Sequence, residues 1–171
     1  MDHSHIVTRF DKDLSEIESL LVEMADLVAK QISDSALALQ LGDNQLAKAV
    51  TKNDSKINRL EEKIDDKAIR LIALRQPMAE DLRSAITTLK VSNCLERMGD
   101  YAKTLSYRAR KVDDFSAMKS ILRSITETSE KIINMLNVVM EAYVNRDLNK
   151  AYDAREADQE INDRTDALFR E

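Results

Sequence analysis

Residues 95–102 read LERMGDYA, and this stretch decides what kind of helix the surrounding sequence builds. Its two acids, Glu96 and Asp100, are four residues apart, so they share one side of a helix while the apolar residues occupy another. Gly99 is one of only two glycines in the chain, and a glycine inside a helix costs about 1 kcal/mol relative to alanine. Such a glycine serves close packing against a neighbouring helix or an open surface beside the acids. We expect the open surface.

The composition around this stretch predicts an all-helical protein with short connections. The 171 residues include one proline, two glycines, no tryptophan and only 4% aromatic residues. Apolar stripes recur at helical spacing over segments of about 30 residues, which is typical of bundles of long antiparallel helices. The five expected helices cover residues 6–40, 44–74, 78–111, 115–144 and 148–170. The expected stops and caps are Gly42, Asp43 or Asn44, Pro77, Asp113 or Asp114, and Asp147.

The sequence also repeats itself. Residue 28 aligns with residue 132, residue 43 with 147 and residue 54 with 158, a constant offset of 104 residues, and the apolar residues and caps agree. We therefore expect tandem three-helix units. Residues 1–113 form the first unit, and residues 114–171 form the first two helices of a second.

The second unit is incomplete, because its third helix would begin near residue 182, beyond Glu171. The last two helices would then keep part of their apolar face without a partner, and such a face predicts association, with a homodimer as the expected form. The residues expected to stay half exposed are Leu136, Val139, Ile161 and Leu168.

The second expected helix carries a strip of polar side chains beside its apolar stripe. The strip consists of Asp54, Asn58, Glu61 and Asp65. We expect it to meet Glu96 and Asp100 on an outer face of the bundle, where carboxylate and amide oxygens suit a hard or borderline cation. The alternative is a solvated face on which arginines pair with the acids and leave no room for a cation. The candidate arginines are Arg70, Arg83 and Arg97.

Charge and composition exclude several classes of function. The net charge of −5 argues against nucleic acid as a partner. No apolar run approaches 18 residues, so we expect no membrane span, and the first residues lack the apolar region of a secretory signal. The single cysteine, Cys94, forms no intrachain disulfide. A cytoplasmic protein fits these features.

An enzyme of the di-iron helical-bundle type is a further alternative. Such sites use Glu-x-x-His pairs that project into the core. The only histidines, His3 and His5, lie at the N-terminus, and the acids are expected to face outward. We therefore expect no enzymatic activity.

The combination of motifs resembles one known family. RQPMAEDLR at residues 75–83, LERMGDYA at 95–102, and Asp54-x-x-Ile57-Asn58 are similar to the PhoU family of phosphate-transport accessory and regulatory proteins, and the resemblance covers the whole chain. It implies two tandem three-helix bundles in a cytoplasmic, often dimeric protein. It also implies metal clusters on the bundle surfaces, bound through Glu/Asp-x-x-x-Asp motifs.

Carried over residue by residue, the resemblance implies a divalent metal or an iron cluster, with Fe, Zn, Mn or Mg as candidates. Asn58 and Asn162 stand where the family commonly has aspartate, which weakens charge-driven metal binding. The third helix of the second bundle is absent, so the chain is shorter than is usual in the family. The implied ligands are Glu96, Asp100, Asp54 and Asn58 in the first unit, and Asp158 and Asn162 in the second.

The family role implied by the resemblance is that of a signalling adaptor. It would bind the phosphate ABC transporter ATPase and the phosphate sensor histidine kinase, and so repress phosphate-regulon signalling and phosphate uptake. The alternative is a metal-free helical interaction module with an unknown partner. In that case arginine–carboxylate pairs would satisfy the acids, and function would depend on helix faces alone.

Overall fold

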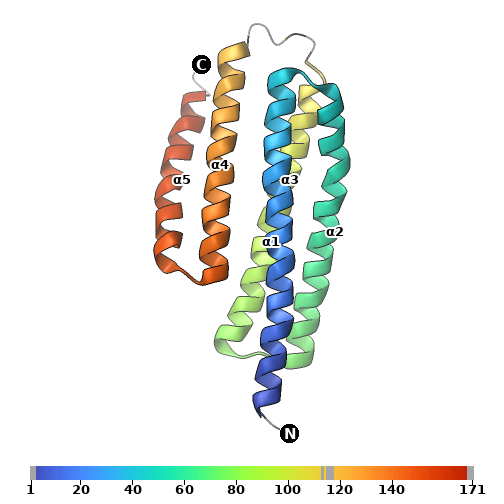
Figure 1. The fold of residues 1–171 in the computed structure, drawn as a ribbon, viewed down its shortest axis with the longest axis vertical. Coiled ribbons are helices and arrows are strands. Elements are labelled where there is room, and N and C mark those ends of the chain that lie inside the picture. Colours follow the sequence, from blue (N-terminus) through green and yellow to red (C-terminus); the bar gives the residue numbers. More distant parts are fainter. Residues whose placement is uncertain (1–2, 113, 115–117, 169–171) are drawn as a thin grey trace.

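The fold consists of long helices lying side by side (Figure 1). The computed structural model describes residues 3–112, 114 and 118–168. All regular structure in these residues is helical, which confirms the predicted fold class. Within the same residues, no helix combines the length and the apolar character needed to cross a membrane. The helices are α1 (His3–Leu41), α2 (Asn44–Arg75), α3 (Ala79–Ala109), α4 (Lys119–Asn145) and α5 (Leu148–Leu168).

Two of the predicted caps form as expected. The Asp43 side chain accepts hydrogen bonds from the backbone N–H groups of Gln45 and Leu46 at 2.8 and 3.0 Å, and so caps α2. Gly42 precedes it with φ 64°, a left-handed conformation that favours glycine. Asp147 caps α5 in the same way, through Oδ1. The two turns therefore follow the repeat.

The predicted start of α4 at residue 115 lies outside the described residues. The helix is described from Lys119, and Met118 holds the cap position without a side-chain hydrogen bond. Asp113 and residues 115–117, on which the prediction rested, lie outside the described residues. Asp114 lies too far from Lys119 along the chain to act as its cap.

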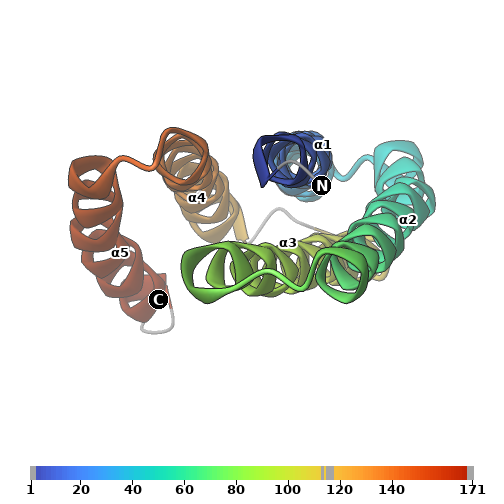
Figure 2. The ribbon, with the colours of Figure 1, turned by 90° about the horizontal axis from the view of Figure 1, so that it is seen from below.

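The first three helices form the centre of the molecule. α1, α2 and α3 each pack against the other two, and α4 packs mainly against α1 and α5 (Figure 2). A hydrogen bond between the Thr88 and Tyr143 hydroxyls also links α3 to α4. Among the described residues, α5 packs against α4 alone. The apolar stripes of the first three helices meet in one core. Its most deeply buried large side chains are Ile17, Leu21, Met24, Ile57, Ile64 and Leu95.

Part of the predicted exposed face of α4 and α5 is buried. Leu136 and Ile161 are only 7% and 9% exposed, so the prediction was wrong for these two residues. The reason is that Leu136 joins the core of the first three helices, while Ile161 lies against side chains of α4. Val139 is 41% exposed, as expected, and the side chain of Leu168 lies outside the described residues.

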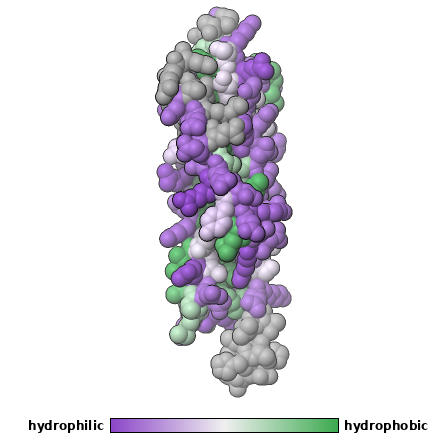
Figure 3. Space-filling model, turned by 90° about the vertical axis from the view of Figure 1, so that its left-hand side faces the viewer, coloured by the Kyte–Doolittle hydropathy of each residue, from purple (hydrophilic) through white to green (hydrophobic). Residues whose placement is uncertain are grey.

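The outer side of α5 is largely hydrophilic, with small apolar patches (Figure 3). This agrees with a helix that packs against a single neighbour. Leu136 of α4 shares a core with residues of α1 to α3, so the packing does not separate the two predicted units. The division of the chain into residues 1–113 and 114–171 stays a prediction.

Candidate functional site

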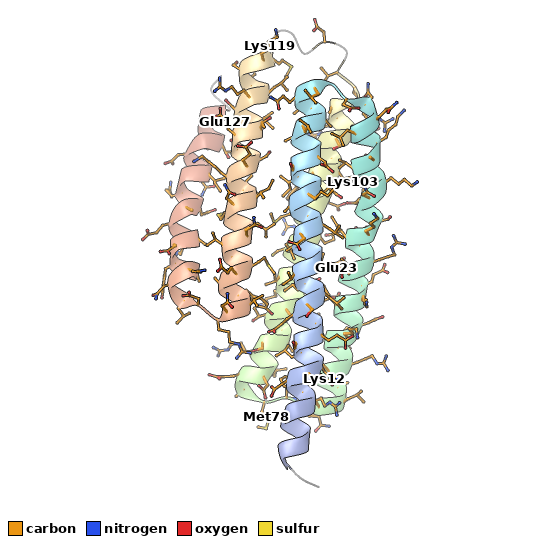
Figure 4. All side chains as sticks on the ribbon, in the orientation of Figure 1. Lys12, Glu23, Met78, Lys103, Lys119 and Glu127 are labelled. Carbon is orange, nitrogen blue, oxygen red and sulfur yellow. The ribbon has the colours of Figure 1, made fainter. Side chains whose placement is uncertain are left out.

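The acids of α2 and α3 meet where these two helices pack together, as the sequence predicts. The predicted outward-facing position is wrong for Asp54, which is only 3% exposed. The link between the acids of the two helices is a lysine. The Lys103 ammonium lies 2.7 Å from Asp54 Oδ2 and 3.2 Å from Asp100 Oδ1. Lys103 lies in the upper half of the bundle, beside α1 and α2 (Figure 4). Residues Asp54, Asn58, Glu61, Glu96, Asp100 and Lys103 are called the acidic strip below.

Asp54 is the buried centre of this arrangement. It is only 3% exposed, and both of its carboxylate oxygens have a donor. Oδ1 accepts a hydrogen bond from Gln31 Nε2 at 3.0 Å, and Oδ2 receives the Lys103 ammonium. A buried carboxylate is tolerated only when it is paired and hydrogen-bonded, so these two partners explain why an acid can lie here.

Gln31 joins three helices at one point. Its side chain is buried, and Nε2 also donates to the Gly99 carbonyl at 3.0 Å. One amide group on α1 therefore binds a side chain of α2 and the backbone of α3. These two hydrogen bonds fix the register of the three helices along the bundle axis at the acidic strip.

Gly99 serves close packing, and the predicted open surface was wrong. Gly99 is buried, and a Cβ atom built on it would lie 3.0 Å from Ile57 Cδ1 and 3.7 Å from Gln31 Nε2. The missing side chain therefore lets α3 approach the Ile57 side chain of α2. The acids flank this contact on the more exposed side, where Glu96 and Asp100 are both partly exposed.

Repulsion builds up in the part of the acidic strip that Lys103 does not reach. Partial burial raises the pKa of Glu96, and the nearby Asp100 and Glu61 carboxylates raise it further. Partial burial likewise raises the pKa of Glu61, as does Asp65, while a hydrogen bond with Asn93 opposes the shift. These shifts mean that one additional positive charge beside Glu96 and Glu61 would be favourable.

Whether a metal fits can be judged from the donors present. Asn58 Oδ1 is buried without a hydrogen-bond partner, and an unsatisfied amide oxygen on the same helix as Asp54 and Glu61 is a chemically suitable ligand for a hard cation. However, no three Asp, Glu, His or Cys side chains of the described residues converge closely enough to hold a metal ion. The donor chemistry fits a metal, whereas the geometry with Lys103 in place does not. The metal site stays a prediction.

The second predicted ligand pair lies elsewhere. Asp158 and Asn162 are exposed on α5, and Asn162 Nδ2 donates to Asp158 Oδ2 at 3.2 Å. α5 packs only against α4, so these two residues do not join the acidic strip. The structure brings no third helix against them among the described residues.

Sequence reasoning missed the two residues that organise the site. The sequence suggests arginines as partners of the acids, but Arg97 donates to the Tyr101 hydroxyl, and Lys103 is the cation that pairs with Asp54. The available signal was the spacing of three residues between Asp100 and Lys103, which places them together on a helix. For Gln31, the signal was a lone amide among buried apolar residues of the first helix.

Together these features define a class of protein: a long helical scaffold with acids gathered where its second and third helices meet. The model of the PhoU domain matches residues 21–109, which is more than half of the chain. This chain belongs to the PhoU family.

Curated relatives match over nearly the full chain. The phosphate-specific transport system accessory protein PhoU homolog of Caulobacter vibrioides is 36% identical, and the match covers 98% of this chain and 73% of the relative. The protein of the same name from Clostridium acetobutylicum is 34% identical over 95% of this chain and 74% of its own length.

Solved structures agree with the fold. PhoU from Pseudomonas aeruginosa superposes with a TM-score of 0.88 at 29% identity, covering 94% of this chain and 77% of that one. The phosphate transport system regulatory protein PhoU from Streptococcus pneumoniae gives a TM-score of 0.84 at 26% identity, covering 93% and 74%. The helical bundle predicted from the resemblance is therefore confirmed.

The close packing at Gly99 predicts a coupling with Ile57. Alanine at a helix interior gains about 1 kcal/mol over glycine, but here its methyl group would press on Ile57 Cδ1. Gly99→Ala should therefore raise the free energy of unfolding by less than about 1 kcal/mol in the natural chain. In an Ile57→Val background, which lacks Cδ1, the same substitution should give the full increase. Urea unfolding of the four proteins measures the coupling, expected at about 0.5–1 kcal/mol. Additive effects would contradict the packing role.

The repulsion at Glu96 predicts a pH-dependent stability gain. Its pKa is raised above the ordinary 4.5 in the folded protein, so its ionised form costs stability at neutral pH. This destabilisation is fully present when the pH is above the pKa of Glu96 in the folded protein. It is lost as the pH falls from that pKa to the pKa in the unfolded chain. In a chelating buffer, Glu96→Gln should therefore stabilise the protein at pH 7 and give no gain near about pH 4.

Thermal unfolding at both pH values measures this difference. Glu130→Gln, an exposed position on α4, is the matched control and should change little at either pH. An equal gain for Glu96→Gln at the two pH values would show that repulsion at this site is not the cause.

Proposed function

We propose that this protein is an accessory regulator of phosphate transport that acts in the cytoplasm by binding other proteins and not as an enzyme. The observation that carries the proposal is the match to relatives named phosphate-specific transport system accessory proteins, which extends over 98% of this chain for Caulobacter vibrioides. In this role the protein holds down phosphate-regulon signalling and phosphate uptake when phosphate is plentiful. Its partners are the phosphate ABC transporter ATPase and the phosphate sensor histidine kinase.

The end of the bundle formed by the α2–α3 connection is our candidate for partner contact. Leu74 and Met78 are 72% and 81% exposed there, and Met78 lies at the opposite end of the bundle from the α1–α2 turn (Figure 4). Gln76 and Ala79 both hold positive φ values in this connection. Large apolar side chains held out into solvent by a tight connection are typical of docking surfaces.

Capture from the native host tests the adaptor role. The tagged full chain, expressed in cells grown in high phosphate and solubilised gently, should retain the transporter ATPase or the sensor kinase. Leu74→Ser should reduce this capture several-fold, because it removes apolar contact area at the proposed docking end. Leu41→Ser is the matched control, since Leu41 is 66% exposed at the other end of the bundle.

Mass spectrometry of the captured proteins gives the result. Failure to retain either partner with the natural chain would count against the adaptor role. If Leu74→Ser and Leu41→Ser reduced the captured partner by the same amount, the adaptor role would still hold. The α2–α3 connection would then not be the docking surface.

We also infer a structural cation at the acidic strip, a divalent metal or an iron cluster held by Glu96, Asp100, Asp54 and Asn58. The raised pKa of Glu96 and the unsatisfied Asn58 Oδ1 support it. Such a cation would neutralise repulsion on the strip and lock α2 to α3. Asp158 and Asn162 are a weaker second candidate, because they are exposed and no other helix contributes a ligand. The metal-free module is favoured instead if Lys103 and Gln31 suffice to neutralise Asp54.

A homodimer is the form of association that the fold supports. An apolar groove with a volume of about 320 Å³ lies between α3 and α4, and Cys94, Met98 and Val139 are among the side chains that line it. α5 has only one packing partner. A second copy could cover this face and complete the contacts of α4 and α5.

A charge placed in the groove should weaken the dimer. Val139→Asp should lower the dimer fraction at micromolar concentration, because the interface would have to bury a carboxylate. Val144→Asp is the matched control, as it is similarly exposed on the same helix but does not line the groove. Light scattering coupled to size exclusion measures the mass. A natural chain that stays monomeric would reject the dimer.

A further inference from the structure

The outer side of α3 carries a line of cations. Figure 2 shows no helix on the far side of α3 from α1. Taken at alternating steps of four and three residues from Arg83 to Arg108, this side contains four basic residues and no acid. All four basic side chains are exposed, and none of them forms an ion pair within the described part of the chain. These residues, called the basic face of α3 below, are Arg83, Lys90, Arg97 and Arg108.

The outer side of α5 carries the opposite charge. Steps of three and four residues along this helix give four acids and no base, namely Asp153, Glu156, Glu160 and Asp163. The side chains of Asp153, Glu156 and Asp163 are exposed, and within the described residues they form no ion pair. These three residues are called the acidic face of α5 below.

The two charged faces border one surface of the molecule, on which α4 lies between α3 and α5. Lys90 lines the apolar groove between α3 and α4, and Asp153 lines a second groove between α4 and α5. Met135 of α4 lines both grooves, so the two grooves are neighbours. The surface is therefore basic along α3, mostly apolar in the middle and acidic along α5.

Two copies of the chain can place this surface against itself in two ways. A two-fold axis parallel to the bundle sets α3 of each copy opposite α5 of the other. A two-fold axis across the helices sets α3 opposite α3 and α5 opposite α5. In the first arrangement cations face carboxylates, whereas in the second each charged face meets its own kind.

We propose that this protein forms a homodimer in which the basic face of α3 pairs with the acidic face of α5 of a second copy, about a two-fold axis parallel to the bundle. This inference rests on the homodimer proposed above and adds which helices meet in it. An axis along the bundle leaves every residue at the same position along that axis. Lys90 and Asp153 both lie beside the part of α4 around Met135, so this symmetry brings them to similar levels.

The charges select the arrangement and supply little of its affinity. Exposed ion pairs each add little stability, because water and salt screen them. Like charges placed opposite each other across an interface are unfavourable, and this repulsion rejects the arrangement in which α3 meets α3. Burial of the apolar grooves on either side of Met135 supplies the association energy.

Charge reversal tests the pairing with purified full chains. One variant, Lys90→Glu with Arg97→Glu, makes α3 acidic; the other, Asp153→Lys with Glu156→Lys, makes α5 basic. Each variant alone should dimerise about tenfold more weakly than the natural chain or worse, because like charges would then face each other. An equimolar mixture of the two should form a heterodimer, because both of its α3–α5 contacts again join opposite charges.

Native mass spectrometry with a reducing agent measures the species by mass, and Lys52→Glu with Arg59→Glu is the matched control. Lys52 and Arg59 are exposed on α2, seven positions apart as Lys90 and Arg97 are, and their reversal changes the net charge equally. α2 packs against α1 and α3, away from the grooves beside α4. The control should dimerise as the natural chain does, and circular dichroism checks that every variant is helical.

The outcomes separate the pairing from the homodimer itself. A heterodimer formed by the two reversed variants, each of which stays monomeric alone, would support the pairing. If the α3 variant paired with the natural chain more readily than with the α5 variant, α3 would meet α3, and the pairing would be overturned. Equal dimerisation of all variants would overturn the pairing and leave the homodimer standing. A natural chain that stays monomeric at micromolar concentration would overturn both.

Discussion

The buried charge of Asp54 is the constraint on which the rest of this structure depends. A carboxylate that is 3% exposed has to be paired, and loss of a partner of a buried charge costs about 3–5 kcal/mol. Its two partners come from two other helices, Gln31 from α1 and Lys103 from α3. The register of the three-helix unit is therefore set by polar contacts inside a mostly apolar core.

The same point explains the glycine in α3. Gln31 can reach both Asp54 and the Gly99 carbonyl only if α3 lies close to α2, and a side chain at residue 99 would meet Ile57 at 3.0 Å. The cost of a glycine inside a helix is thus offset by a close helix contact and by a hydrogen bond to backbone. Gly99 and Gln31 act as one packing unit, and the acids beside them are held on a rigid base.

This base holds negative charge at two levels of burial. Glu96 and Glu61 repel each other on the partly exposed side, whereas Asp54 is neutralised on the buried side. The acidic strip therefore has a neutralised, buried end and a partly exposed end on which negative charges lie close together.

The sequence by itself determined the all-helical fold, the caps at Asp43 and Asp147, the meeting of the acids of α2 and α3, and the family. These depend on local periodicity, capping chemistry and motif spacing, which neighbouring residues fix. Only the tertiary structure decided that Gly99 is a packing contact, that Lys103 rather than an arginine pairs with Asp54, and that Leu136 is buried in the core of the first three helices. Each of these depends on which faces of distant helices meet, and helical spacing within one segment does not contain that information.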